Sequence, residues 1–360
     1  MPNVPLIFDA HLDLSMNAME WNRDIRLPQV EIRRRELGMK DLADRTRNTV
    51  CLPEMRRGRI GLCVATQIAR YSGRFSTLPG WRSPEQAWAQ TQGQLAWYRT
   101  MEDAGELVQL RTWPEVEAHA KLWREATVTE KLPIGYLLSL EGADSILSWR
   151  HLEKTRADGL IAMGPVHYGP GIYGHGTDDE GPLTAKGQEL VKEMDRLGII
   201  LDVTHLCDES FWDALGRFHG PVWASHHNCR VLADWNRQLA DDQIKALVER
   251  GAVIGMAFDA IMMVHGWTHK RSTPHNFGLK MEKICEHIDH ICQIAGNARH
   301  VGIGTDLDGG YGTEQTPMDL DSIADLVTLA GPLAKRGYSP ADIEGIYEGN
   351  FLRFLREHLK

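Results

Sequence analysis

Six histidine and acidic residues in this sequence stand where short apolar runs end, a placement typical of metal ligands. His11 and Asp13 close the first run, and residues two apart on an extended chain point the same way. The others, each after a separate run, are Glu141, His205, His226 and Asp306. Converging imidazoles and carboxylates suit a divalent metal such as Zn²⁺. A single His-x-Asp can equally be a hydrogen-bonded pair in a loop, so the metal hypothesis depends on whether the fold gathers all six.

The elements that must position these residues are eight short apolar runs of the kind found in buried strands. The first begins at Leu6, and the others span residues 60–67, 133–140, 159–163, 199–203, 221–225, 252–257 and 300–304. The last five alternate closely with helical patterns, which indicates a parallel sheet with helices outside it. Eight repeats favour an α/β fold of the closed (β/α)₈ TIM-barrel type over an open doubly wound sheet. In such a barrel all six residues would lie on the same C-terminal face.

Helical spacing of apolar residues predicts the helices that connect these runs. The expected ranges are 84–103, 114–125, 185–197, 208–216, 241–250, 279–295, 319–335 and 350–358. No linker or shift in composition divides the chain, so we expect one barrel domain over residues 1–360. The segment 16–131 is longer than its strands need, and we expect insertions mainly there, over the C-terminal face of the barrel.

Composition and charge argue against several classes of function. The 360 residues carry a formal net charge of −9, which does not suit a protein that binds nucleic acid or an acidic membrane surface. No apolar run approaches the roughly 20 residues that span a bilayer, and no signal peptide is evident, so we expect a cytoplasmic location. The six cysteines are scattered, as is typical of reduced thiols. The exposed helices leave room for a homodimer.

The six ligand-type residues together indicate hydrolytic chemistry. Six nitrogen and oxygen ligands suit two Zn²⁺-like ions that share a bridging carboxylate. Two such ions lower the pKa of a shared water to near neutrality and polarise a carbonyl group.

The stretches around these residues also form a set with a fixed order along the chain. They are residues 8–13, 139–142, 201–205, 224–226 and 302–309, followed by Gly349-Asn350-Phe351-Leu352 near the C-terminus. In that order they resemble the motifs of the renal (membrane) dipeptidase family of metallopeptidases, in the amidohydrolase superfamily, over nearly the whole chain. The resemblance implies a barrel enzyme with two Zn²⁺ per chain. It also implies hydrolysis of the peptide bond of small dipeptides by a metal-bridging water or hydroxide.

The resemblance also implies a role for each ligand. His11 and Asp13 would bind one zinc ion, His205 and His226 would bind the other, and Glu141 would bridge both ions.

Three further residues acquire catalytic or substrate-binding roles from the resemblance. Asp306 matches the acid that handles the proton of the nucleophile. His167 falls where the family has a histidine that polarises the scissile carbonyl. Arg237, eleven residues past His226, falls where the family has an arginine that grips the substrate carboxylate. Arg230 is the rival for that last role and ranks second because its spacing does not fit.

Two other functions are compatible with the same residues. One is a related binuclear amidohydrolase that acts on another small amide or ester, such as an N-acyl amino acid or a lactone, because barrel loops exchange specificity readily. The other is a metal-stabilised scaffold without catalytic activity. We expect the glycine-rich loop at residues 164–181 to be a mobile part of the pocket rim, and the insertions within 16–131 to select the substrate, whose identity and stereochemistry the sequence leaves open.

Overall fold

The computed structural model describes residues 5–73 and 80–359, and its centre is a sheet of parallel strands. Hydrogen-bonded neighbours follow the order β7-β6-β5-β4-β2-β1-β9-β8. The strands are β1 (Ile7–Leu12), β2 (Ile60–Ile68), β3 (Leu107–Gln109), β4 (Ile134–Glu141), β5 (Leu160–Gly164), β6 (Ile200–Asp202), β7 (Val222–Trp223), β8 (Ile254–Met256) and β9 (Val301–Ile303). Every residue of β1 and β4 is buried, which is why these strands read as continuous apolar runs.

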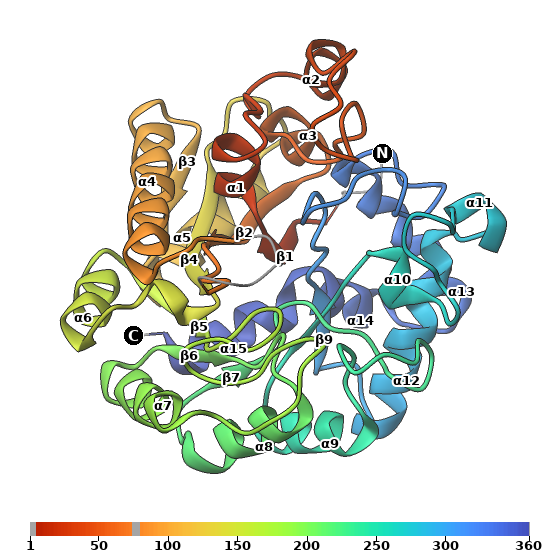
Figure 1. Cartoon of the computed structure of the whole chain (residues 1–360). Helices are drawn as coiled ribbons and strands as arrows, with labels where there is room; N and C mark the ends of the chain where they lie inside the picture. The colour runs from red at the N-terminus through yellow and green to blue at the C-terminus, as the bar shows by residue number, and fades with distance from the viewer. Residues whose placement is uncertain (1–4, 74–79, 360) are drawn as a thin grey trace.

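The sheet curls until its two outer strands, β7 and β8, nearly meet. Ala224, just after β7, forms a parallel bridge with Ile254 of β8. The backbone N–H of Ala224 donates to the carbonyl of Val253 at 3.1 Å, and that of Gly255 donates to the carbonyl of Ala224 at 2.8 Å. These contacts make a nearly closed barrel of eight parallel strands with helices between them, which confirms the predicted (β/α)₈ fold (Figure 1).

All eight runs predicted as strands contain a strand, and β3 is an additional one that the sequence does not predict. Residues 107–109 of β3 pair with Ile134–Tyr136 at the start of β4, and β5 pairs with β4 from Leu138 onward. The strand β3 therefore lies beside β4 outside the ring of eight. Three residues are too few to show a periodic pattern.

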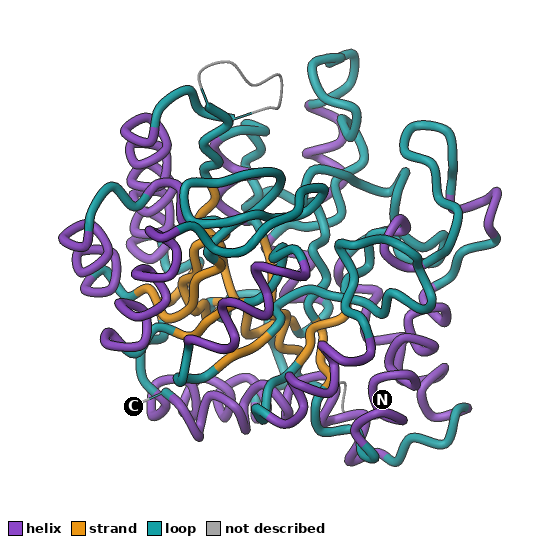
Figure 2. Tube along the Cα trace, turned by 60° about the horizontal axis from the view of Figure 1, so that its bottom comes forward, coloured by secondary structure: helices purple, strands orange, loops and turns teal. Residues whose placement is uncertain are grey.

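Helices surround the strands, and the loops gather on one side of them (Figure 2). The predicted helices appear as α4 (Pro84–Asp103), α5 (Trp113–Glu125), α7 (Ala185–Leu197), α8 (Asp208–Arg217), α9 (Asp241–Glu249), α12 (Ile284–Ala295), α13 (Ala330–Lys335) and α15 (Asn350–His358). Shorter additions are α1 (Leu14–Met19), α2 (Gln29–Arg35), α3 (Leu52–Arg57), α6 (Trp149–Ala157), α10 (Ala260–Met263), α11 (Pro274–Phe277) and α14 (Pro340–Glu344). The regions predicted as helix before α12 and α13 begin instead with the 3₁₀ turns Met281–Lys283 and Ile323–Leu329.

The C-terminal helix α15 packs against the barrel through the residues that begin it. The Phe351 ring stacks on Phe8 of β1 with ring centroids 5.2 Å apart. A Cβ at Gly302 of β9 would lie 2.6 Å from Phe351, so only glycine allows this approach. The Asn350 side-chain amide donates to the carbonyls of Ala298 and Val301, both at 2.7 Å. These contacts account for Asn350 and Phe351 in the Gly-Asn-Phe-Leu sequence at residues 349–352.

The segment between β1 and β2 is tied to the mouth of the barrel by one buried carboxylate. Asp308, after β9, accepts hydrogen bonds from the backbone N–H and hydroxyl of Thr49, both at 2.7 Å, and from the N–H of Val50 at 2.9 Å. The guanidinium of Arg23 lies 3.8 Å from the same carboxylate. The first insertion is therefore held against the C-terminal ends of the strands.

None of the helices between residues 5 and 73 or 80 and 359 combines the length and apolar character needed to cross a bilayer. All six cysteines are free thiols.

Unfolding stability should depend on pH through His287 of α12. Its Nδ1 accepts from the backbone N–H of Cys229 at 3.1 Å, which leaves Nε2–H to donate to the carbonyl of Met263, also at 3.1 Å. Burial lowers the pKa of His287 to about 4, below the value of about 6.5 in an unfolded chain. Between these values the unfolded chain binds more protons, so stability is lost as the pH falls. We expect His287 to account for a loss of roughly 2 kcal/mol between pH 7 and pH 5.

Urea denaturation of the wild type and His287→Asn at pH 5, 6 and 7 would measure this contribution. The variant should lose less stability than the wild type over that range, whereas the exposed His269→Asn should match the wild type. Equal pH dependence in all three proteins would contradict the assignment.

Candidate active site

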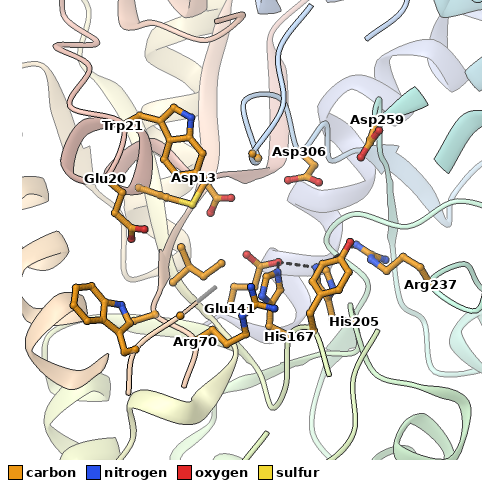
Figure 3. A pocket seen from close by; sticks show the side chains of 18 of the residues that line it. Asp13, Glu20, Trp21, Arg70, Glu141, His167, His205, Arg237, Asp259 and Asp306 are labelled. Atoms are coloured by element: carbon orange, nitrogen blue, oxygen red, sulfur yellow. Dashed lines mark hydrogen bonds and ion pairs between the residues drawn. The ribbon is translucent and has the colours of Figure 1, made fainter. Parts of the chain in front are cut away.

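A cavity of about 280 Å³ opens at the C-terminal ends of the strands and contains most of the residues predicted from the sequence (Figure 3). Six of the eight line it: Asp13, Glu141, His167, His205, Arg237 and Asp306. The other two, His11 and His226, are buried, and their Nε2 atoms lie 3.6 and 3.5 Å from the Glu141 carboxylate. The structure therefore brings all eight together. The volume is near the lower end of pockets that bind small molecules, about 300 Å³.

The ends of the barrel strands explain why these side chains converge. His11 lies at the end of β1, Asp13 directly follows that strand, and Glu141 is the last residue of β4. Four other site residues each lie three positions after the last residue of a strand: His167 after β5, His205 after β6, His226 after β7 and Asp306 after β9. In a parallel barrel these ends share one face, so residues more than 290 positions apart in the chain become neighbours.

One group of possible metal ligands centres on His11. Its Nε2 lies 3.8 Å from an oxygen of Asp13, 3.6 Å from Glu141 and 3.7 Å from Asp306. These distances are too long for hydrogen bonds, and the buried Nε2 has no hydrogen-bond partner within the described residues. Ligands about 2.1 Å from one tetrahedral ion would be about 3.4 Å apart, close to these separations.

A second group centres on the other oxygen of Glu141. This Oε1 lies 3.0 Å from Nε2 of His205, the contact marked in Figure 3, and 3.5 Å from Nε2 of His226. The two imidazole Nε2 atoms are themselves 3.3 Å apart. Two ring nitrogens and a carboxylate oxygen that converge in this way also fit a divalent cation. Glu141 therefore has one oxygen in each group.

The charges in the cluster favour a bound cation. Burial raises the pKa of Glu141 to about 8 and that of Asp306 well above its usual range. Burial alone would lower the pKa of His11, but Glu141 and Asp13 outweigh it and raise the pKa to about 10. A positive charge placed among these carboxylates is thus strongly stabilised. The donor types, the distances and the negative field all fit a divalent metal.

His167 and Arg237 stand beside the metal-ligand groups. His167 Nε2 lies 3.9 Å from Glu141, and burial, aided by the positive charge of Arg70, lowers the pKa of His167 to about 3. Its imidazole is therefore neutral. One Arg237 nitrogen, Nη2, donates to the carbonyl of His226 at 3.0 Å. The other, Nη1, is buried without a partner among the described residues, and Arg237 lines the cavity.

The rival arginine does not enter this cavity. Arg230 forms an ion pair with Asp208, its Nη atoms lying 2.6 and 2.8 Å from the two carboxylate oxygens. His227, next to His226, is buried but does not line the cavity either.

Two buried aspartates hold the strand ends that carry the ligands. Asp9 accepts from the backbone N–H of His11 at 3.2 Å and from the N–H and hydroxyl of Thr305 at 2.9 and 2.6 Å, which joins β1 to the loop before Asp306. Asp202 accepts in the same way from the N–H groups of residues 204 and 225, at 3.0 and 3.1 Å, which joins the ends of β6 and β7. Each aspartate therefore links two neighbouring ligand-bearing loops.

The backbone itself takes a rare conformation at two of the site residues. His205 has φ 69° and Asp306 has φ 57°, in the left-handed region that non-glycine residues seldom occupy. Such positions cost of order 1–3 kcal/mol each and persist where the surroundings fix them. Here the His205 imidazole reaches Glu141, with Nε2 3.0 Å from Oε1, and the Asp306 carboxylate lies 3.7 Å from Nε2 of His11.

Sequence reasoning misses the hydroxyl groups that orient two of the imidazoles. Thr177 Oγ1 lies 2.9 Å from Nδ1 of His205, and Ser225 Oγ lies 3.0 Å from Nδ1 of His226. A hydrogen bond at Nδ1 leaves Nε2 free to face a metal. Ser225 adjoins its histidine in the sequence and could be found from that. Thr177 lies in the glycine-rich loop, where no periodic pattern identifies it.

Backbone hydrogen bonds hold the glycine-rich loop at residues 164–181 beside the site. The N–H of Thr177 donates to the carbonyl of His167 at 3.0 Å, and the N–H of Gly169 donates to the carbonyl of Thr177 at 2.8 Å. His167 and Tyr168 are the residues of this loop that line the cavity.

The first insertions and the segment after β2 supply much of the remaining cavity wall. The lining residues from these segments are Met16, Glu20, Trp21, Ile68, Ala69, Arg70, Gly80 and Trp81. Asp259 and Met262 line it from the segment after β8. The prediction that residues 16–131 shape the pocket is consistent with this lining, but no pattern in the sequence identifies Arg70 or Asp259.

A histidine and carboxylate cluster at the C-terminal mouth of a (β/α)₈ barrel defines the class of metal-dependent hydrolases. Residues 3–359 match the family described as membrane dipeptidase (peptidase family M19). The chain therefore belongs to this metallopeptidase family, which confirms the resemblance drawn from the motifs.

Individual relatives agree with this placement. An uncharacterised protein of Klebsiella pneumoniae is 31% identical over 215 residues, which cover 58% of this chain and 75% of that protein. The crystal structure of a metallopeptidase described as dipeptidase AC is 24% identical, with a TM-score of 0.78 and 99% of each chain covered. A metallopeptidase of Rhodobacter sphaeroides, liganded with a phosphinate mimic of L-Ala-D-Ala, is 22% identical with a TM-score of 0.77, and 98% of this chain and 99% of that chain are covered. Several curated dipeptidases are matched over less than two thirds of their own length.

Removal of divalent ions should lower the thermal stability of the protein. The fold gathers these ligands, so we expect the ion to bind the folded state, and an ion that binds only the folded state stabilises it by about 2.7 kcal/mol at a hundredfold excess over its Kd. Chelator treatment should therefore lower Tm by several degrees, and added Zn²⁺ should restore it, as measured by scanning calorimetry. Glu141→Gln should respond much less to Zn²⁺, whereas the exposed Glu117→Gln should respond like the wild type. Equal responses of both variants would contradict the ligand role of Glu141.

Proposed function

We propose that this chain is a binuclear zinc dipeptidase that hydrolyses the peptide bond of small dipeptides. The observation that carries the proposal is the position of Glu141, whose Oε1 lies 3.0 Å from His205 Nε2 and whose Oε2 lies 3.6 Å from His11 Nε2. One carboxylate thus reaches two groups of ligands. His11 and Asp13 would hold one ion, and His205 and His226 would hold the other.

The residues beside the ligands account for the remaining steps of hydrolysis. When bound, the two ions supply a nucleophilic water at neutral pH and polarise the scissile carbonyl. Asp306 faces the cavity and can accept the proton of that water and pass it to the leaving amine. His167 can donate a hydrogen bond to the carbonyl oxygen as negative charge develops there.

Arg237 supports a substrate with a free carboxylate. Its Nη1 is buried without a partner in the described parts of the chain, while Nη2 is anchored on the carbonyl of His226. A guanidinium held in this way can bind a carboxylate through charge-assisted hydrogen bonds and fix the register of the dipeptide. The alternative, a binuclear amidohydrolase acting on an N-acyl amino acid or a lactone, uses the same metal ligands and differs only in the substrate.

A substrate panel separates these functions. Protein loaded with zinc, its metal content confirmed by elemental analysis, would be assayed with L/L and L/D dipeptides, their C-terminal amides, N-acetyl amino acids and a lactone. L-Ala-D-Ala belongs in the panel because the Rhodobacter sphaeroides relative was crystallised with a mimic of it. We expect turnover of free dipeptides and strong loss with the amides. Inactivity toward all dipeptides, or faster turnover of N-acetyl amino acids, would overturn the proposal.

Asp306→Asn should remove most activity while the metal stays bound. The amide has nearly the same shape but cannot take up or deliver the proton, so kcat should fall by about 10²–10⁴-fold. Steady-state kinetics and elemental analysis of the same sample would test this, with the exposed Asp234→Asn as a control that keeps wild-type kcat. Retained kcat in Asp306→Asn would remove Asp306 from the proposed mechanism.

Arg237→Met should reduce discrimination in favour of the free carboxylate. The ratio of kcat/KM for a dipeptide to that for its C-terminal amide should fall by about 10–100-fold, because the charge-assisted contact is lost. Arg230→Met is the matched control, since that side chain pairs with Asp208 outside the cavity, and it should keep the wild-type ratio. A fall in the ratio for Arg230→Met alone would assign the carboxylate contact to the rival arginine.

A further inference from the structure

A second arginine, Arg70, faces the same cavity, and no carboxylate of residues 5–73 or 80–359 forms an ion pair with it. Arg70 follows β2 and lines the cavity, and its buried Nε has no hydrogen-bond partner in the part of the chain that the structure describes. Within the described residues no ion pair reaches its guanidinium: Cζ lies 5.8 Å from the centroid of the Tyr168 ring, and the negative charges that act on it, Asp144 and Glu141, stay beyond ion-pair distance. The buried Arg23, Arg45 and Arg56 each form an ion pair with a glutamate, at 2.8, 2.8 and 2.6 Å, whereas Arg237, like Arg70, forms none with a described residue. A half-buried and unpaired guanidinium that faces a substrate cavity indicates an anionic ligand.

The backbone holds Arg70 in place independently of its side chain. The carbonyl of Arg70 accepts from the N–H of Trp81 at 2.8 Å, and the N–H of Tyr71 donates to Asp144 at 3.2 Å. A Cβ at Gly80 would lie 2.9 Å from the Arg70 carbonyl oxygen, so the chain at Gly80 packs tightly against the chain at Arg70. These backbone contacts do not require the Arg70 side chain, which can therefore contact a ligand in the cavity.

Arg70 and Arg237 lie on opposite sides of the metal-ligand cluster. In Figure 3, Glu141, His167 and His205 stand between the two arginines. A dipeptide whose C-terminal carboxylate is bound by Arg237, and whose scissile bond lies over the cluster, must extend its N-terminal residue toward Arg70. Glu20 lies on the Arg70 side in the same view and lines the cavity. That end of the cavity therefore offers one cationic group and one anionic group.

We propose that Arg70 binds a side-chain carboxylate on the N-terminal residue of the substrate, so that the enzyme favours dipeptides that begin with Glu or Asp. Such a residue carries an ammonium group and a carboxylate, which match the anionic Glu20 and the cationic Arg70. This assignment rests on the proposed dipeptidase function and narrows it to acidic substrates. Arg70 is a specificity-determining residue in this scheme and takes no part in the bond cleavage.

The test compares substrates that differ in charge but hardly in size. The kcat/KM for L-Glu-L-Ala should exceed that for L-Gln-L-Ala in the wild type by at least about tenfold, as expected for a charge-assisted contact. In Arg70→Met this ratio should fall to near one. Arg150→Met, which changes an exposed arginine on α6, is the control and should keep the wild-type ratio.

The position of the acidic side chain is tested by the reversed pair, L-Ala-L-Glu and L-Ala-L-Gln. Their ratio should be the same in the wild type and in Arg70→Met. An unchanged Glu-Ala to Gln-Ala ratio in Arg70→Met would overturn the proposal, and so would a loss confined to the reversed pair.

A binding measurement separates this proposal from the dipeptidase function itself. Reduced-peptide analogues of Glu-Ala and Gln-Ala, which cannot be hydrolysed, would be titrated into the zinc-loaded protein by calorimetry. Tighter binding of the Glu analogue in the wild type but not in Arg70→Met supports the role of Arg70 even if no dipeptide is hydrolysed, a result that would contradict only the proposed function. Equal binding of the two analogues by the wild type would overturn the role of Arg70.

Discussion

The Glu141 carboxylate lies buried among three imidazoles, and the organisation of the barrel mouth depends on that position. Its two oxygens face different histidines, His11 on one side and His205 with His226 on the other. Three carboxylates meet around His11 in a region nearly closed to water, where unpaired negative charge is costly. A divalent cation resolves this cost, so the binding of metal and the stability of the mouth are two aspects of one electrostatic constraint.

The surrounding structure serves to keep these groups at fixed separations. Asp9 and Asp202 each join two loops through hydrogen bonds to backbone N–H groups, and Thr177 and Ser225 orient the rings of His205 and His226. None of these four needs to contact a substrate. Their effect is to leave each Nε2 facing the cluster, which is the condition for metal binding by a neutral imidazole.

The fold and the ligands could be predicted because both depend on the same repeated signal. A buried parallel strand appears in the sequence as an apolar run, and the barrel places the C-terminal end of every strand on one face. The ends of these runs therefore predict that His11, Glu141, His226 and Asp306 lie close together. The strand β3 escaped prediction because its three residues show no pattern. Arg70 and Thr177 escaped because they belong to loops, whose paths are set by hydrogen bonds between residues far apart in sequence rather than by periodicity.

The left-handed backbone at His205 and Asp306 sets stability against activity when either residue is substituted. Glycine would occupy those φ angles more readily than histidine or aspartate, so a glycine at either position would relieve local strain. Such a substitution would stabilise the folded chain and would also remove a functional group from the site. Screening variants for thermal resistance alone would therefore favour replacement of these two residues, and a stabilised form of this protein is useful only if activity is selected together with stability.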